Sequence, residues 1–230
     1  IDGSVGSNAA DSNTVKAIEA FQARFTGSAD GVVDVHGQTF PALLDAAGEA
    51  ESAPTPAGPV AAGACLFPFT SVPAQNWTSS PRSFASNRNG GSRLHAGCDL
   101  YFPRGTPIHA VADGVVVRGP YSFYAQTFAL EVDHGAFIAR YGEIQEATLK
   151  RAGDRVSAGE RIASVGHLVG ITVPSDMLHF ELYDKSASGP LTVAESSKSA
   201  QRGGVPFMRR KDLFDPTSSL NQWQNSLPAA

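Results

Sequence analysis

The sequence predicts a mainly β protein, with an antiparallel two-sheet, barrel-like groove domain and a small N-terminal α-helical module. From residue 65 onward, short β-branched or aromatic runs alternate with Gly and Asp turns, a pattern typical of strands. No long apolar run at helical spacing interrupts these strands. Helical spacing is found instead near the start of the chain, and a segment rich in Ala, Pro and Gly separates the two parts.

Residues 1–45 are expected to form the helical module. Apolar residues recur at helical spacing from Val15 to Phe25, and Gly27 ends this first helix. The stretch "GQTFPALLDAAG" predicts a second short helix with Pro41 in its first turn. Because two short helices bury little apolar area, we expect that this is part of a module whose first helix precedes the chain.

Residues 46–64 have the composition of an exposed linker, and residues 65–230 are expected to form the main domain. The two cysteines, Cys65 and Cys98, are far apart in the sequence and form no CxxC pattern, which argues against a cysteine zinc site. They could pair in a disulfide or remain two buried thiols, and the sequence leaves both alternatives open.

Bulk composition excludes several classes of protein. Lys and Arg total 18 against 22 Asp and Glu, a net charge of −4, so bulk charge does not favour nucleic-acid binding. No apolar run approaches the roughly 18 residues of a membrane span. The chain opens at Ile1 without a charged and apolar leader, so we expect no signal peptide within it. The sequence shows neither an export route nor an oligomeric state.

Two segments hold candidate metal ligands. In "RLHAGCDLY", His95 and Asp99 are four residues apart, which on an extended chain places both side chains on one face. His179, inside the strand-like "LHFELY", is the candidate third ligand. Two imidazoles and one carboxylate suit Zn²⁺, and three protein ligands leave a fourth position for water, as in catalytic zinc sites. Spacing of this kind also arises by chance.

The segment "RLHAGCDLYFPRGTPIHAVADGVVV" resembles the entry segment of the lysostaphin/LytM-type zinc metallopeptidases, which are peptidoglycan endopeptidases. That family's pattern runs HxGxD, then a PxGTP turn, then AxxDGxV. The stretches "VDHGAFIARYGEI", "AGDRVSAGERIASVG" and "MLHFELY" are similar to its later blocks and follow in the same order. The resemblance implies a LytM-like fold with Zn²⁺ held by His95, Asp99 and His179. The tail "KDLFDPTSSLNQW" resembles the family's closing segment, which we expect to pack back on the domain.

The first module has a resemblance of its own. "TVKAIEAFQ", followed by "ADGVVDVHGQTFPALL", is similar to the second half of a peptidoglycan-binding helical module. This resemblance implies that peptidoglycan is the partner and that the module raises the local concentration of the second domain at the polymer. We therefore expect action in the periplasm or cell wall. Self-remodelling, a bacterial toxin and a phage lytic protein (a lysin) are all compatible with it.

Two positions differ from the family pattern. The family usually has a histidine that begins an HxH motif and another in a YxH motif, and the resemblance assigns them to activating water and stabilising the oxyanion. Met177 and Glu143 stand at these positions. We predict that Glu143 is the general base, as glutamates are in other zinc proteases, although a merely solvated glutamate is the alternative. Met177 is expected to be an apolar wall, which leaves His167 and Tyr141 as candidate substrate or oxyanion donors.

For three other polar residues, His109, His134 and Arg93, the sequence favours structural roles. His109 and His134 are expected to be structural histidines of the β domain. Arg93 could pair with a carboxylate of the substrate, but a salt bridge with a neighbouring residue is the simpler prediction.

The sequence thus predicts a zinc-dependent peptidoglycan hydrolase. It would cleave an amide of the wall peptide, either as an endopeptidase or as an amidase at the sugar–peptide bond. The alternative is a catalytically inactive wall-binding or regulatory protein that keeps the zinc site.

Overall fold

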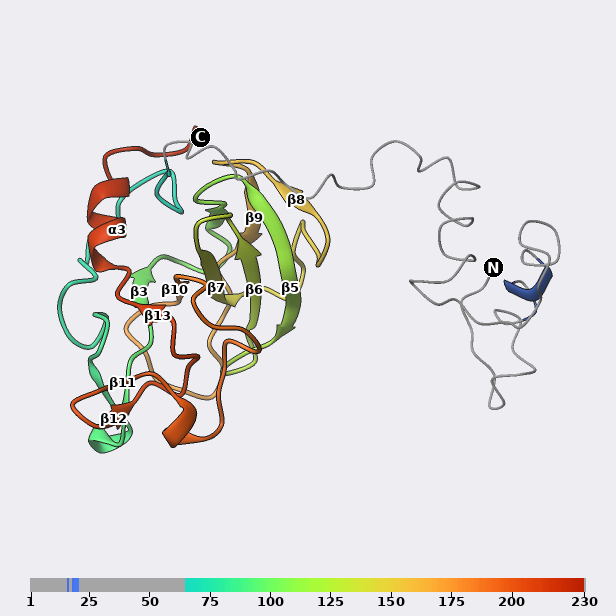
Figure 1. The fold of residues 1–230 in the computed structure, drawn as a ribbon. Helices are drawn as coiled ribbons and strands as arrows, with labels where there is room; N and C mark the ends of the chain where they lie inside the picture. The colour runs from blue at the N-terminus through green and yellow to red at the C-terminus, as the bar shows by residue number, and fades with distance from the viewer. Residues whose placement is uncertain (1–15, 17, 21–64, 230) are drawn as a thin grey trace. The chain divides into compact units, whose positions relative to one another are not determined.

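The structure is a computed structural model that describes residue 16, residues 18–20 and residues 65–229 (Figure 1). The chain divides into two compact units, Ile1–Gly58 and Pro59–Ala230. In the first unit the described residues are helical, as predicted for that stretch. The rest of the predicted module and the predicted linker lie outside the described residues, so both stay predictions.

A seven-stranded antiparallel sheet organises the second unit and confirms the mainly β prediction. Its strands, in order across the sheet, are β13 (Leu213–Phe214), β10 (Met177–Tyr183), β7 (Ile138–Ile144), β6 (Phe128–Asp133), β5 (Gly114–Ser122) and β8 (Arg155–Val156). A further strand, β3 (Cys98–Tyr101), pairs with β10 on the side away from β7. The long strands β5, β6 and β7 lie side by side in Figure 1.

Among residues 65–229, three two-stranded sheets accompany this main sheet. They pair β1 (Asn87–Arg88) with β2 (Arg93–Leu94), β4 (Pro107–His109) with β9 (Arg161–Ser164), and β11 (Gln201–Arg202) with β12 (Val205–Pro206). The described helices are η2 (Asn89–Gly91), η3 (Ser196–Lys198) and α3 (Thr217–Trp223), besides the N-terminal helical residues. The described strands do not close into a barrel: one large sheet carries the domain and the others are short. The barrel-like part of the prediction is therefore wrong.

Strand β10 is buried along its whole length. Its residues Leu178, Phe180 and Leu182 belong to the main apolar core. Because side chains alternate along a strand, the residues between them face the other way and need polar partners inside the protein. The tail packs back as predicted, since the Trp223 ring of α3 lies 6.2 Å from the ring of Phe180.

Both cysteines are free thiols in the structure, so the disulfide alternative is wrong, but only Cys98 is buried and Cys65 is half-buried. Burial raises the pKa of the Cys98 thiol to about 12. His109 and His134 are buried and bond through Nδ1 to the backbone carbonyls of Gly159 and Asp113, as expected of structural histidines. Among the described residues, no helix has the length and apolar character needed to cross a membrane.

Candidate metal centre

The structure brings the three predicted ligands together. The register between β3 and β10 places Asp99 directly opposite His179, and His95 lies just before β3. The Asp99 Oδ1 lies 3.0 Å from His95 Nε2 and 2.9 Å from His179 Nδ1, and these two nitrogens are 3.0 Å apart. All three side chains are buried. The side chains form a compact triangle of two nitrogens and one oxygen, which we call the ligand triangle.

Gly97 allows this triangle to form. A Cβ atom at this position would lie 2.3 Å from the carbonyl oxygen of Phe180, a distance that real Cβ atoms do not adopt. Only glycine therefore lets the segment between His95 and Asp99 approach the backbone of β10. The same approach brings His179 to the other two ligands.

The ligand triangle fits a zinc ion. Zinc takes imidazole nitrogen and carboxylate oxygen at about 2.0–2.2 Å, which is compatible with donor atoms about 3 Å apart. Each ligand is also oriented by a further hydrogen bond. These bonds run from His95 Nδ1 to the Ser83 carbonyl (2.9 Å), from His179 Nε2 to Glu181 Oε1 (2.8 Å), and from Arg88 Nη2 to Asp99 Oδ2 (3.2 Å). With the opposite ring nitrogens occupied, His95 Nε2 and His179 Nδ1 are directed at the centre of the triangle.

Buried charges shift the pKa values of the ligands. Burial alone would raise the pKa of Asp99, but the two histidines outweigh it and hold the pKa well below its ordinary value. Burial would lower the pKa of His179, but hydrogen bonds to Asp99 and Glu181 outweigh it and raise the pKa to about 9. Burial lowers the pKa of His95. The triangle therefore holds an ionised carboxylate.

Glu181 supports the triangle from behind and was missed by the sequence reasoning. It is fully buried, yet its pKa is held well below the ordinary value because nearby cations outweigh the effect of burial. Its carboxylate accepts hydrogen bonds from four side chains: His179 Nε2, Arg140 Nη1, Arg209 Nε and the Tyr183 hydroxyl. The signal was present in "HFELY", where three polar side chains alternate with apolar ones in a buried strand.

A β-bulge turns Glu143 toward the ligand triangle. The register between β6 and β7 pairs Ala129 with Gly142 and Phe128 with Ile144, so Glu143 is the extra residue. Its backbone is left-handed, with φ 61°, which is uncommon outside glycine and is often found where a side chain is re-aimed. The alternation of β7 alone would point Glu143 to the same side as Tyr141, into the core.

The Glu143 carboxylate is buried and incompletely paired. Glu143 is only 8 % exposed, and no described group forms a hydrogen bond with its Oε2 atom. Burial raises the pKa of Glu143 to about 8, and the negative charge of Asp99 adds to the rise. The alternative prediction, a merely solvated glutamate at a hairpin end, is therefore wrong. A buried polar atom without a partner is uncommon and calls for an explanation.

Glu143 and the ligand triangle line one cavity of about 860 Å³. The cavity is also lined by Met177, which packs with Tyr101 and Leu168 and forms an apolar wall as predicted. Phe123 lies against the triangle, its ring centroid 5.8 Å from that of His179. The cavity thus has an apolar side and a polar side that meet at the ligand triangle, as in many ligand sites.

His167 and Tyr141 do not line this cavity. His167 lies at the surface, where Nδ1 is 3.2 Å from the Asp176 carboxylate. Tyr141 is fully buried in the core, and its hydroxyl lies 3.0 Å from both Val111 N and His134 Nε2. In this arrangement neither side chain is placed to contact a substrate in the cavity, so the prediction that they are substrate or oxyanion donors is wrong.

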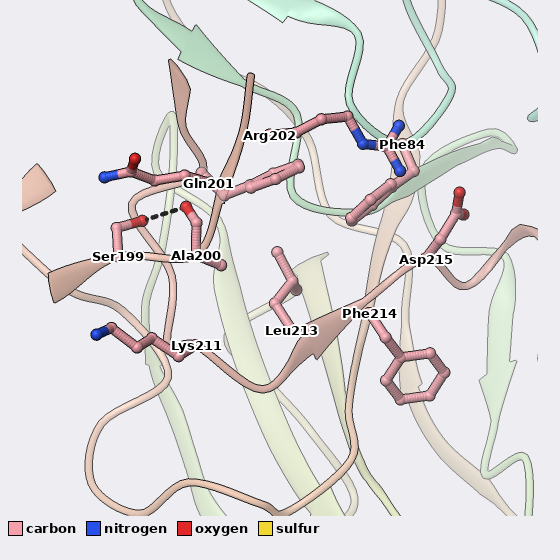
Figure 2. Close-up of a pocket in the computed structure, with 10 residues that line it drawn as sticks. Phe84, Ser199, Ala200, Gln201, Arg202, Lys211, Leu213, Phe214 and Asp215 are labelled. Atoms are coloured by element: carbon pink, nitrogen blue, oxygen red, sulfur yellow. Dashed lines mark hydrogen bonds between the residues drawn. The ribbon is translucent and has the colours of Figure 1, made fainter. Parts of the chain in front are cut away.

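A second hollow, of about 450 Å³, lies beside the β11–β12 hairpin (Figure 2). There the Phe84 ring stacks on Phe207 at 4.9 Å, and the Arg202 guanidinium lies 5.3 Å from the centre of the Phe84 ring. None of the three ligand residues lines this hollow. The candidate site is therefore the larger cavity.

Comparison with known proteins agrees with this geometry. Residues 93–190 match the family model described as peptidase family M23. The chain is 33% identical over 89 residues to the peptidoglycan DD-endopeptidase ShyC of Vibrio cholerae serotype O1. The aligned residues cover 39% of this chain and 20% of that protein. It is 32% identical over 151 residues to an uncharacterized metalloprotease of Haemophilus influenzae, covering 64% of this chain and 31% of that protein. The chain thus spans less than a third of the length of either relative.

Solved structures with a similar fold include the catalytic domain of lysostaphin from Staphylococcus simulans. It is 21% identical with a TM-score of 0.42, over 60% of this chain and 89% of that one. A zinc-containing peptidase from Vibrio cholerae is 19% identical with a TM-score of 0.41, over 66% of this chain and 40% of that one. The ligand triangle lies wholly within the stretch that matches the family model. Residues 93–190, which hold the whole ligand triangle, are thus similar to peptidase family M23, in line with the lysostaphin/LytM-type resemblance of the sequence.

Proposed function

We propose that the chain is a zinc-dependent peptidoglycan hydrolase that cleaves an amide bond of the wall peptide. The observation that carries this proposal is the ligand triangle beside the unpartnered Glu143 carboxylate in one cavity. The M23 match and the relative named as a peptidoglycan DD-endopeptidase support the class of reaction and of substrate.

In this proposal His95 Nε2, Asp99 Oδ1 and His179 Nδ1 hold the zinc ion. When bound, zinc lowers the pKa of a water molecule toward about 7 and polarises a carbonyl group. The three side chains are already oriented by hydrogen bonds at their far sides, so little reorganisation is needed to bind the metal.

Glu143 is the proposed general base. Its carboxylate takes the proton of the attacking water and passes it to the leaving amine. The position of the carboxylate supports this role, because it is buried in the same cavity as the ligand triangle and its Oε2 has no hydrogen-bond partner among the described residues. A positioned base of this kind contributes roughly 10²–10⁴-fold to the rate.

The partner and place of action follow from the same proposal. The substrate is peptidoglycan, the site of action is the periplasm or the cell wall, and the N-terminal module holds the second unit at the polymer. The bond is a peptide bond or the sugar–peptide amide. Self-remodelling, a toxin directed at other cells and a phage lytic protein would all use this site in the same way.

A second candidate function rests on Met177. This residue stands where the family usually has a histidine, and it adds an apolar surface to the cavity but no proton donor. A wall-binding or regulatory protein that keeps the metal centre without turnover would tolerate this residue.

Digestion of purified sacculi tests the proposal. We expect the chain to release soluble fragments in the presence of zinc, a chelator to abolish release, and added zinc to restore it. His95→Ala should remove activity and bound zinc, whereas His167→Ala, which alters a histidine outside the cavity, should retain both. Mass spectrometry of the fragments would identify the bond. Zinc binding without any release would instead favour the second candidate function.

A further inference from the structure

We propose that Arg93 binds a carboxylate of the wall peptide inside the cavity and so selects substrates that carry a free acid. This inference rests on the proposed function, because it specifies the substrate of the same site. It is carried by an arginine that lines the cavity and has no partner there.

Arginines give the cavity its positive side. Four of them are among its lining residues: Arg88, Arg93, Arg118 and Arg209. Three of the four have acidic partners. These ion pairs are Arg88 with Asp99 at 3.2 Å, Arg118 with Glu131 at 3.8 Å and Arg209 with Glu181 at 2.8 Å. Their charges are therefore balanced by the protein itself.

Arg93 differs from the other three. No described residue forms an ion pair or a hydrogen bond with its guanidinium, and its Nε is buried without a partner. The salt bridge predicted from the sequence is thus wrong. Burial lowers the pKa of Arg93, and the positive charges of Arg209 and Arg88 lower it further. The charge of Glu181 offsets only part of this effect. Since an arginine remains protonated in proteins, this side chain is a partly buried cation without an ion pair among the described residues.

The position of Arg93 directs it to the substrate. It lies in β2, two residues before His95, so an extended backbone places both side chains on the same face. Both line the cavity, together with Glu143. An anion held by Arg93 would therefore lie in the same space as a peptide whose amide is at the ligand triangle.

The chemistry of the guanidinium favours a carboxylate. Its planar fork matches the two oxygens of a carboxylate and forms two parallel hydrogen bonds, a strong and geometrically specific contact. The cavity volume of about 860 Å³ is within the range that holds ligands larger than a single amino acid, so one peptide can reach both groups. A phosphate presents related chemistry, and the experiment below separates the two.

The test compares two soluble wall peptides that differ in one group, a free carboxylate or its carboxamide. Binding to the zinc-supplemented chain is measured by calorimetry, and hydrolysis is followed in the same samples by mass spectrometry. We expect the acid to bind about tenfold or more tightly than the amide. Arg93→Gln should abolish this preference, and Arg93→Lys should retain part of it because the charge remains.

Arg118→Gln is the matched control, because it removes an arginine from the same cavity that already has an acidic partner. It should leave the preference unchanged. Equal binding of acid and amide by the unaltered chain would overturn the proposal, and so would an equal loss in Arg118→Gln, since the effect would then be general charge. Displacement of the peptide by inorganic phosphate but not by acetate would assign the site to phosphate. Hydrolysis of both peptides at equal rates would refute the role of Arg93 while leaving the proposed function intact.

Discussion

His179 is hydrogen-bonded through Nε2 to the carboxylate of Glu181, 2.8 Å away and two residues further along the same strand. The two-residue period of a β-strand makes this contact possible, because it places both side chains on one face. The contact fixes which nitrogen of His179 is free for a metal. It also joins the candidate metal centre to a buried set of charges that includes Arg140 and Arg209.

Removing this contact should weaken metal binding. We expect Glu181→Gln to lower zinc affinity about 10- to 100-fold, because a neutral amide replaces the charged acceptor that orients the His179 ring. It should also destabilise the fold by ~3–5 kcal/mol, because Arg140 and Arg209 lose a buried partner. Zinc affinity is measured by competition with a chromophoric chelator, and stability by urea unfolding. Glu160→Gln, at a more exposed ion pair with Lys150, is the control. Unchanged zinc affinity in Glu181→Gln would contradict this account.

Substitution of Gly97 should damage both stability and metal binding. The added Cβ atom of Gly97→Ala would meet the Phe180 carbonyl at 2.3 Å, and neither backbone segment can move without separating β3 from β10. We expect a loss of about 3 kcal/mol of folding free energy together with loss of zinc binding. Ser92→Ala, at an exposed position of the same region, should stay within about 0.5 kcal/mol of the unaltered chain. A Gly97→Ala protein that melts normally and binds zinc would show that the close approach is not required.

His134 should make stability depend on pH away from the metal centre. Burial lowers its pKa from the ordinary 6.5 to about 4. At a pH between these two pKa values, His134 is therefore protonated in the unfolded chain and neutral in the folded chain. The stability due to neutral His134 is fully present above about 6.5 and is lost as the pH falls toward 4, up to about 3 kcal/mol. Urea unfolding between pH 7 and pH 4 should show a shallower decline in His134→Asn than in the unaltered chain, and equal slopes would refute the assignment. His167→Asn serves as the surface control.

Much of the fold and of the site follows from local patterns in the sequence. The alternation of β-branched residues with Gly and Asp turns predicts the strands of the main sheet, and the spacing of His95 and Asp99 predicts their shared face. Predicting His179 as the third ligand also depended on the resemblance to a known family. Its pairing with Asp99 requires a register between strands whose residues are 80 positions apart in the sequence. Such a register is set by the whole sheet and not by either segment alone.

Other parts of the site lie beyond such patterns. Glu143 reaches the cavity through a β-bulge and a left-handed backbone, which strand alternation does not predict for a glutamate. Glu181 was missed because a charged residue in an apolar strand looks unfavourable until its buried arginine partners are known. The unpaired state of Arg93 is likewise a property of the folded surroundings, and a search for opposite charges nearby in the sequence does not reveal it.

The rate of fragment release from sacculi by zinc-loaded Glu143→Gln tests whether the Glu143 carboxylate is the general base. The substitution keeps the size of the side chain and removes the base. We expect the rate to fall roughly 10²–10⁴-fold, with zinc content equal to that of the unaltered chain. Glu146→Gln, in the loop that follows the same strand, should retain full activity. Undiminished release by zinc-loaded Glu143→Gln would show that another group moves the proton and that Glu143 is not the base.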